Sequence, residues 1–220
     1  MQLPFQRDAF DVQRTKMVQA QIEARGIRDP RVLAAMRDVP RHEFVPEALR
    51  DKAYEDHPLP IGEGQTISQP YIVAVMLAHM ALQPADRVLE IGTGSGYATA
   101  LLSRLCAEVY SIERHGELAA VAEATLARLG YSKVRVRVGD GRVGWPENSP
   151  FDAILVSAAA SEIPAALFAQ LHSGGRMIVP VGPPASQELQ LIRKINDEPE
   201  VQVLEGCRFV PLVEGAVVTH

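Results

Sequence analysis

The chain has 220 residues, of which 47% are hydrophobic, and carries a formal net charge of −5. A chain of this size can bury one substantial core with a small appended lobe. The acidic balance argues against a nucleic-acid partner, because phosphate binding usually needs a basic face. Two cysteines, Cys106 and Cys207, are too few for a disulfide framework, and no Cys/His spacing suggests zinc, so we expect reduced structural thiols and no metal site.

The first residues have no long apolar core of the kind found in signal peptides, and no stretch of the chain reaches a membrane-spanning length. We therefore expect a cytoplasmic protein, with residues 1–9 as a loose extension. The pattern then becomes helical over residues 10–25, and Gly26 is a plausible stop. Asp29 and Pro30 are typical of an N-cap and first helical position, and they precede a buried stripe that ends at Pro40. A further short helix is expected over residues 46–53.

The stretch over residues 59–70 is rich in proline, glycine and small polar residues, which predicts a loop and neither a strand nor a helix. Pro70 can open a helix whose apolar face includes Val73, Met76 and Met80. Thr66, Ser68 and Gln69 would then lie just ahead of a helix N-terminus. Such side chains can cap free backbone N–H groups, or they can serve a functional site, and the pattern alone favours neither.

Residues 87–105 predict a strand, a glycine turn and a helix. Val88, Leu89 and Ile91 form the strand, and glycines then occupy positions 92, 94 and 96. This is the first unit of a doubly wound α/β domain, in which ligands bind at the carboxyl ends of parallel strands. Glycines allow a tight turn and a close approach of a ligand to the backbone.

The charge near this turn distinguishes between ligands. The dinucleotide fingerprint G-x-G-x-x-G would need a third glycine where Tyr97 stands. Glu90 would face a pyrophosphate unfavourably but would suit a cationic ligand such as S-adenosylmethionine. Glu113 ends the next apolar run and can accept hydrogen bonds from both hydroxyls of a ribose. The alternative is an ordinary glycine turn with two surface acids.

The remaining sequence continues the α/β alternation. We expect a helix over residues 117–129, a half-exposed strand over 134–138, and a fully apolar, central strand over 153–156 that leads into a site loop. Gly139, Asp140 and Gly141 form another acidic turn at a strand end. A helix over residues 164–171 and a turn at Gly174–Gly175 should precede a strand over 176–180. Three strand-like runs follow without a helix (188–195, 201–204 and 207–210), which predicts an antiparallel finish to the sheet.

These residues carry a resemblance to a known family. The order of Glu90 to Gly96, Glu113 and Asp140 is similar to that of class I S-adenosylmethionine-dependent methyltransferases. Within that class the chain resembles the protein-L-isoaspartate O-methyltransferase family over roughly residues 12–213. The stretches that carry this similarity are Val39-Pro40-Arg41 with Phe44-Val45, Leu59 to Gly62 with Thr66 to Pro70, the glycine turn, and Arg208 to Leu212.

The resemblance implies a Rossmann-like, mostly parallel sheet within one domain, in which residues 10–58 cap a core over residues 59–213. It implies an active-site role for Ser68. It also implies cofactor contacts by Gln65, Thr66, Ile67, Ser68, Glu90, Gly92, Thr93, Gly94, Glu113, Asp140 and Gly141. Substrate contacts would come from Ser68, Tyr71, Val210, Pro211 and Leu212. Eukaryotic relatives often have histidine where this chain has Tyr71, so a substrate contact by that side chain is left open.

The reaction implied by the resemblance is methyl transfer from S-adenosylmethionine to the α-carboxylate of an L-isoaspartyl residue in a damaged protein or peptide. S-adenosylhomocysteine is the product, and closure to a succinimide leads back to aspartate. A carboxylate is already ionised at pH 7, so no catalytic base is needed. Ser68 would then aim a carboxylate oxygen through a hydrogen bond, with the barrier lowered by positioning. Isoaspartyl proteins and peptides are the expected partners, with no nucleic acid, no membrane and a monomeric state.

Three other functions are compatible with parts of the pattern. A class I methyltransferase could act on another small-molecule or carboxylate substrate, or on RNA, although the acidic balance argues against RNA. A non-catalytic nucleotide-binding module would not need Glu90, Glu113, Asp140 and Ser68 together. A nicotinamide-dependent oxidoreductase is disfavoured by Tyr97.

Overall fold

The computed structural model describes residues 9–216, so most of the expected N-terminal extension lies outside the described part of the chain. The N-terminal helix is composite: α1 (Ala9–Met17) continues as a π-helical turn (Val18–Ile22) and a 3-10 turn (Glu23–Arg25). It ends at Gly26, which has a φ of 98°. The α2 helix (Pro30–Asp38) begins as predicted, with the Asp29 side chain accepting hydrogen bonds from two backbone N–H groups. Two short 3-10 helices, η3 (Arg41–Phe44) and η4 (Glu47–Lys52), complete this helical part.

The predicted loop over residues 59–70 is in fact largely a β-hairpin, so that prediction was wrong. β1 (Leu59–Gly62) pairs antiparallel with β2 (Gln65–Ile67), and Leu59 lies opposite Ile67. Both of these side chains are buried in the main core, and this burial stabilises a strand pair as short as this one. Proline is tolerated because each strand has one unpaired edge.

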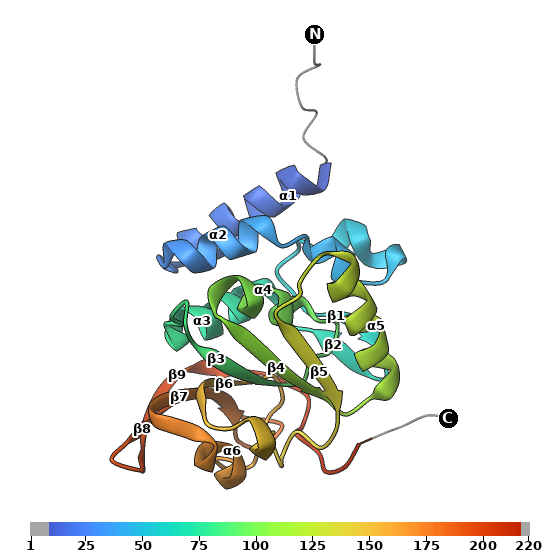
Figure 1. Cartoon of the computed structure of the whole chain (residues 1–220). Coiled ribbons are helices and arrows are strands. Elements are labelled where there is room, and N and C mark those ends of the chain that lie inside the picture. Colours follow the sequence, from blue (N-terminus) through green and yellow to red (C-terminus); the bar gives the residue numbers. More distant parts are fainter. Residues whose placement is uncertain (1–8, 217–220) are drawn as a thin grey trace.

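A seven-stranded sheet forms the centre of the molecule, in the order β5-β4-β3-β6-β7-β8-β9. The first five strands in this order, β5-β4-β3-β6-β7, run parallel to one another (Figure 1). β8 pairs antiparallel with β7, and β9 pairs antiparallel with β8. The strands are β3 (Arg87–Ile91), β4 (Glu108–Glu113), β5 (Val134–Val138), β6 (Phe151–Val156), β7 (Leu171–Val181), β8 (Gln187–Ile195) and β9 (Glu198–Cys207). The apolar β6 lies in the middle of the sheet, as predicted, and the half-exposed β5 lies at an edge. The antiparallel finish is confirmed.

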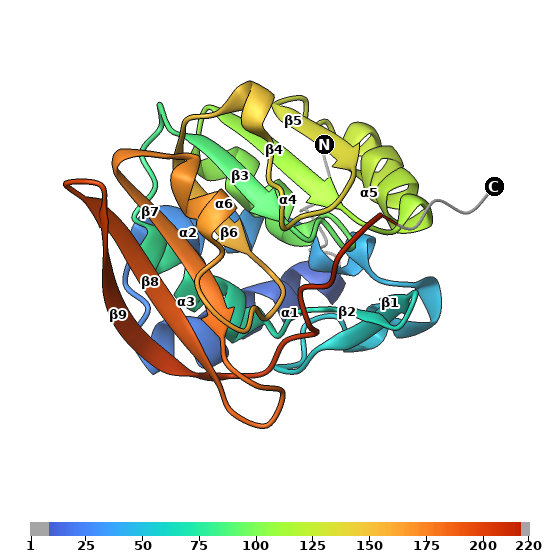
Figure 2. The same cartoon turned by 90° about the horizontal axis from the view of Figure 1, so that it is seen from below.

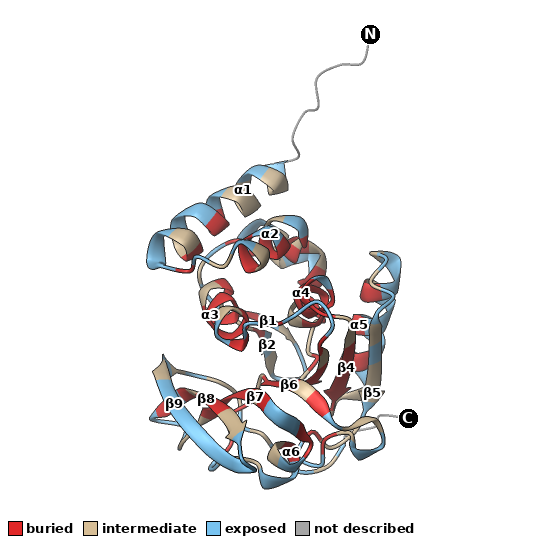
Figure 3. Ribbon diagram, turned by 60° about the vertical axis from the view of Figure 1, so that its left-hand side comes forward, coloured by how far each residue is buried: buried red, intermediate tan, exposed pale blue. Residues whose placement is uncertain are grey.

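The alternation of side chains along the strands divides the core into two layers. Val88 and Leu155 pack with α3 (Pro70–Met80) and α4 (Tyr97–Leu105), while Leu89 and Ile154 pack on the opposite face with α6 (Ala165–Ala169). The α2 helix lies outside α3 and α4 as a further layer (Figure 1). The α5 helix (Gly116–Arg128) lies near the β5 edge. Burial is concentrated in α3, α4 and β4, whereas much of β9 is exposed (Figure 3).

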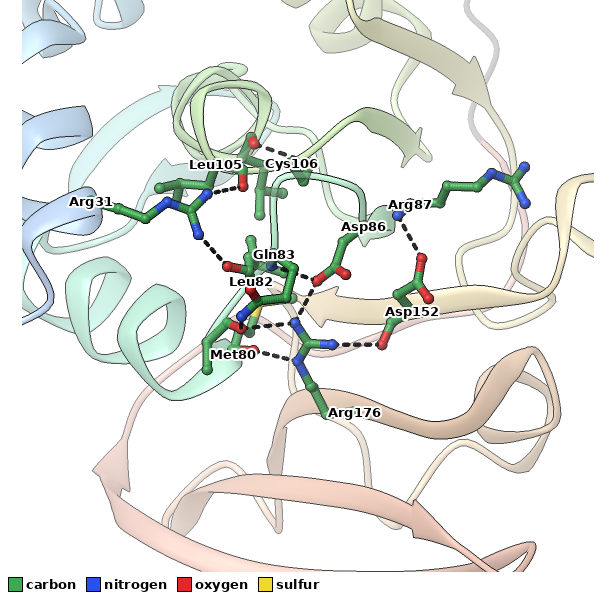
Figure 4. Close-up of polar contacts among 12 residues, drawn as sticks. Arg31, Met80, Leu82, Gln83, Asp86, Arg87, Leu105, Cys106, Asp152 and Arg176 are labelled. Atoms are coloured by element: carbon green, nitrogen blue, oxygen red, sulfur yellow. Dashed lines mark hydrogen bonds and ion pairs between the residues drawn. The ribbon is translucent and has the colours of Figure 1, made fainter.

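Two arginines fasten the ends of the buried helices at the amino-terminal side of the sheet (Figure 4). The Arg31 guanidinium donates to the carbonyls of Leu82 and Leu105, which follow α3 and end α4. The Arg176 guanidinium donates to the Met80 carbonyl and pairs with the Asp86 carboxylate at 2.5 Å. These bonds satisfy carbonyl groups that the ends of helices leave without partners.

The remaining differences from the sequence analysis concern boundaries. The predicted helix over residues 164–171 is shorter, because β7 begins at Leu171 and includes Gly174 and Gly175, which were expected to form a turn. The register of β6 and β7 shifts at this point, so the glycines form an irregularity within the strand. The prediction of a third strand over residues 207–210 was wrong, because only Cys207 belongs to β9 and residues 208–210 continue beyond it outside any strand. None of the described helices is long and apolar enough to cross a bilayer.

Candidate active site

A cavity of about 270 Å³ opens at the carboxyl ends of β3, β4 and β6. Its walls come from the glycine turn, the hairpin, the start of α3 and α4, and the segment after β9. Figure 2 shows the hairpin and that segment passing the same end of the sheet. Most of the predicted site residues line this cavity, namely Gln65, Thr66, Ile67, Ser68, Gly92, Thr93, Gly94, Glu113, Gly141, Val210, Pro211 and Leu212. Glu90, Tyr71 and Asp140 are not among its lining residues.

The glycine turn needs backbone conformations that other residues rarely adopt. Gly92 and Gly94 have φ angles of 91° and 53°. A Cβ atom at Gly94 would lie 3.3 Å from the Ile61 side chain in the hairpin. The turn and the hairpin are therefore packed closely, and the hairpin forms a wall opposite the turn.

Glu113 fixes the shape of this turn from the neighbouring strand. Its carboxylate accepts hydrogen bonds from the backbone N–H of Gly94 at 2.8 Å and of His115 at 3.0 Å. Each carboxylate oxygen can accept more than one hydrogen bond. Glu113 therefore retains acceptor capacity at the cavity wall, as a ribose-binding acid requires.

Glu90 lies beneath the turn and is fully buried. One carboxylate oxygen accepts hydrogen bonds from the Thr99 hydroxyl at 2.6 Å and the Ser111 hydroxyl at 2.7 Å. Ser111 in turn bonds with the hydroxyl of the cavity-lining Thr93 at 2.6 Å. The other oxygen, Oε1, has no hydrogen-bond partner among the described residues. Burial raises the pKa of Glu90 to about 7, against the opposing effect of the two hydroxyl donors. Glu90 is thus an acid that a nearby cation would ionise.

Ser68 lies between the hairpin and α3, and the residues that follow it are held by Asp56. The side chains of Thr66, Ser68 and Gln69 do not cap α3, which has no hydrogen bond from its N-cap side chain. Instead, the Asp56 carboxylate accepts from the Tyr71 backbone N–H at 3.4 Å and from the Gln69 side-chain amide at 2.9 Å. Capping by these three side chains is therefore wrong, and the active-site role of Ser68 stays a prediction.

Tyr71 lies outside the cavity wall. The guanidinium of Arg25 lies over its ring, 3.2 Å from the ring centroid, and pairs with Asp56 at 2.8 Å. Tyr71 therefore belongs to a cluster that holds the start of α3.

The segment after β9 closes the remaining side of the cavity. The Gln187 side chain holds Phe209 by accepting from its N–H at 2.6 Å and donating to its carbonyl at 3.1 Å. Ala159 then pairs with the backbone of Val210 and Leu212. These bonds hold residues 210–212 extended across the site loop that follows β6, and this position explains why they line the cavity.

Asp140 also holds the segment after β9 by a hydrogen bond. Its carboxylate accepts hydrogen bonds from the backbone N–H of Arg142 at 2.8 Å and of Gly215 at 2.9 Å. The acid thus joins the turn after β5 to the end of the described chain, beside the cavity-lining Gly141. A contact between Asp140 and adenine remains a prediction.

Sequence reasoning missed several cavity residues. Tyr97, Arg114 and Met76 line the cavity, although none was proposed as a site residue. Tyr97 and Arg114 directly follow Gly96 and Glu113, so proximity in sequence could have found them. The roles of Asp56 and Gln187 depend on long-range contacts and leave no local signal.

The parallel sheet, the glycine turn and the two acids at the ends of β3 and β4 define a class I S-adenosylmethionine-dependent methyltransferase. A family model described as "Protein-L-isoaspartate(D-aspartate) O-methyltransferase (PCMT)" matches residues 12–217. The chain belongs to this family.

Individual relatives agree with this assignment. The protein-L-isoaspartate O-methyltransferase of Methylorubrum extorquens is 58% identical over 203 residues, which are 92% of this chain and 89% of that protein. The protein of the same name from Opitutus terrae is 56% identical over 90% of this chain and 86% of its own length. A solved Plasmodium falciparum structure, assigned as a protein-L-isoaspartate O-methyltransferase in complex with S-adenosyl-L-homocysteine, superposes with a TM-score of 0.81. It is 28% identical over 91% of this chain and 98% of its own.

Proposed function

We propose that this chain transfers a methyl group from S-adenosylmethionine to the free α-carboxylate of L-isoaspartyl residues in damaged proteins and peptides. Family membership across nearly the whole chain is the observation that carries the proposal. The methyl ester then permits closure to a succinimide, which leads back to aspartate. S-adenosylhomocysteine is the product that remains after transfer.

The cavity residues suit this cofactor. Bound S-adenosylmethionine supplies a methyl group on a sulfonium, and it carries a second positive charge on its ammonium group. The Glu90 carboxyl group is buried below the turn, and its Oε1 has no hydrogen-bond partner within residues 9–216. Glu90 therefore favours the ammonium group of the cofactor near Gly92, Thr93 and Gly94, partly through the hydroxyl chain to Thr93. Glu113 would accept the ribose hydroxyls, and the turn at Asp140 and Gly141 would hold the adenine.

The chain's own residues then act mainly by positioning. An isoaspartyl carboxylate has a pKa near 4 and needs no base at pH 7. The Ser68 hydroxyl donates a hydrogen bond to one carboxylate oxygen and aims it, while Gln65 to Ile67 cover the cofactor. Val210, Pro211 and Leu212 hold the substrate backbone across the cavity mouth. Joining opposite charges neutralises them, so a cavity closed by the hairpin favours transfer over open water.

The wider setting follows from charge and composition. We propose a cytoplasmic monomer whose macromolecular partners are damaged proteins, with no nucleic acid and no membrane. The net charge of −5 is consistent with the absence of a phosphate-binding role. The helical residues 10–58 and the core over residues 59–213 act together as one methyltransferase domain.

The decisive experiment is label transfer from methyl-labelled S-adenosylmethionine to a short peptide that contains isoaspartate. The matched control is the same peptide with ordinary aspartate. Label on the isoaspartyl peptide alone, released by mild base as expected of an ester, supports the proposal. Binding of S-adenosylhomocysteine without transfer to either peptide would refute isoaspartyl repair and retain only the methyltransferase class.

A further inference from the structure

Arg41 stands in a stretch that identified the family but contributes no lining residue to the cavity. It begins η3 in the helical cap, and its side chain is completely buried. Burial lowers the pKa of Arg41 to about 10, so the guanidinium still carries its charge at neutral pH. Burying a charge costs folding free energy unless the charge is well paired, and apolar packing often stabilises a core at least as well as buried charges do. Stability alone is therefore a weak reason for a buried arginine at this position.

The hydrogen bonds of Arg41 join the cap to the substrate loop. Its Nη2 donates to the main-chain carbonyl of Ser68 at 2.8 Å, and its Nε donates to the carbonyl of Ala53 at 2.7 Å. Ala53 follows η4, so one planar guanidinium joins the end of that helix to the proposed active-site residue. A guanidinium can make both bonds at once because its donors are fixed in a fork.

Arg41 also contacts the cofactor side of the site. Its guanidinium carbon lies 4.8 Å from the centroid of the Tyr97 ring. Tyr97 is buried, begins α4 directly after the glycine turn, and lines the cavity. The same side chain therefore contacts the residue that would aim the substrate and the helix that follows the glycine turn.

We propose that Arg41 is a positioning residue for methyl transfer, holding the Ser68 main chain at a fixed place relative to Tyr97 and the glycine turn. This inference rests on the proposed function of Ser68. Arg41 touches no reacting atom, so its effect must pass through the placement of the Ser68 hydroxyl. Small misplacements of a reacting group can cost about a hundredfold in rate.

Arg31 offers a matched control. It is also a cap arginine, and its guanidinium donates to two main-chain carbonyls, those of Leu82 and Leu105 (Figure 4). These carbonyls lie near the amino-terminal ends of β3 and β4, whereas the cavity lies at the carboxyl ends. Arg41→Met and Arg31→Met both remove a charge and two such bonds. Each variant is assayed below its melting temperature for kcat and KM with the isoaspartyl peptide, and for binding of S-adenosylhomocysteine.

We expect Arg41→Met to lower kcat by about tenfold or more, whereas Arg31→Met lowers the melting temperature and leaves kcat within about twofold. Arg41→Lys should restore little of the kcat that Arg41→Met loses, because a lysine ammonium group cannot reproduce the forked donors of a guanidinium. If Arg41→Met does not fold, Arg41→Lys is the variant compared with Arg31→Met. Equal kcat values for the Arg41 and Arg31 variants would overturn the inference.

A double-mutant cycle with Ser68→Ala tests the route of the effect. If Arg41 acts through Ser68, its replacement should change kcat by no more than about twofold once the Ser68 hydroxyl is gone. Fully multiplicative losses would overturn the inference. Failure of the wild-type chain to methylate the isoaspartyl peptide would instead refute the proposed function, so the two failures are distinguishable.

Discussion

Replacing Glu90 with glutamine should change the pH dependence of stability in a defined direction. The carboxyl group is fully buried, and its pKa is raised from 4.5 to about 7, mainly by burial. Between these values the folded chain binds a proton that the unfolded chain releases, so stability falls as pH rises and becomes level above about 7. At 1.36 kcal/mol per pKa unit, the whole effect is roughly 3 kcal/mol. Glutamine is never ionised, so the variant should lack this loss.

The assay is chemical unfolding of the wild-type chain and Glu90→Gln at pH 5 and pH 8. Relative to the variant, the wild-type chain should lose about 2–3 kcal/mol of unfolding free energy between these pH values. Binding of S-adenosylhomocysteine should become tighter as pH rises, because the ammonium group of this ligand favours the ionised acid. Glu90→Gln should weaken this binding. A difference in stability between the two proteins that does not change with pH would refute the reasoning.

Three further predictions concern single side chains. Glu113→Gln places an amide where backbone N–H groups now donate, so the Kd for S-adenosylhomocysteine, measured by calorimetry, should rise at least about tenfold. Gly141→Ala would place a Cβ atom 2.4 Å from a methyl group of Ile91 in the cavity wall. This variant should weaken S-adenosylhomocysteine binding by more free energy than it takes from the stability of the fold. Arg176→Met leaves buried Asp86 without its 2.5 Å partner and should cost about 3–5 kcal/mol in chemical unfolding. Arg104→Met, which removes an exposed ion pair, should cost less than about 1 kcal/mol in the same assay; equal losses would contradict this ranking.

Local patterns determined much of the fold. The apolar run at residues 153–156 predicted a central strand, and β6 lies in the middle of the sheet. Asp29 and Pro30 predicted the start of α2, because a cap acts within one helical turn. The order of the glycine turn and Glu113 predicted a ligand site at the carboxyl edge of the parallel strands, where the cavity is found. Each of these patterns lies within one short segment of the chain.

Other features were decided only by contacts between distant residues. Composition predicted a loop over residues 59–70, yet burial of Leu59 and Ile67 in the core produces a hairpin. Glu90 was expected near a cation, but only the tertiary structure shows it beneath the turn with a raised pKa. The Ser68 carbonyl likewise accepts a hydrogen bond from Arg41, which lies 27 residues earlier in η3. A sequence records the side chains, but burial and hydrogen-bond partners depend on which segments the fold brings together.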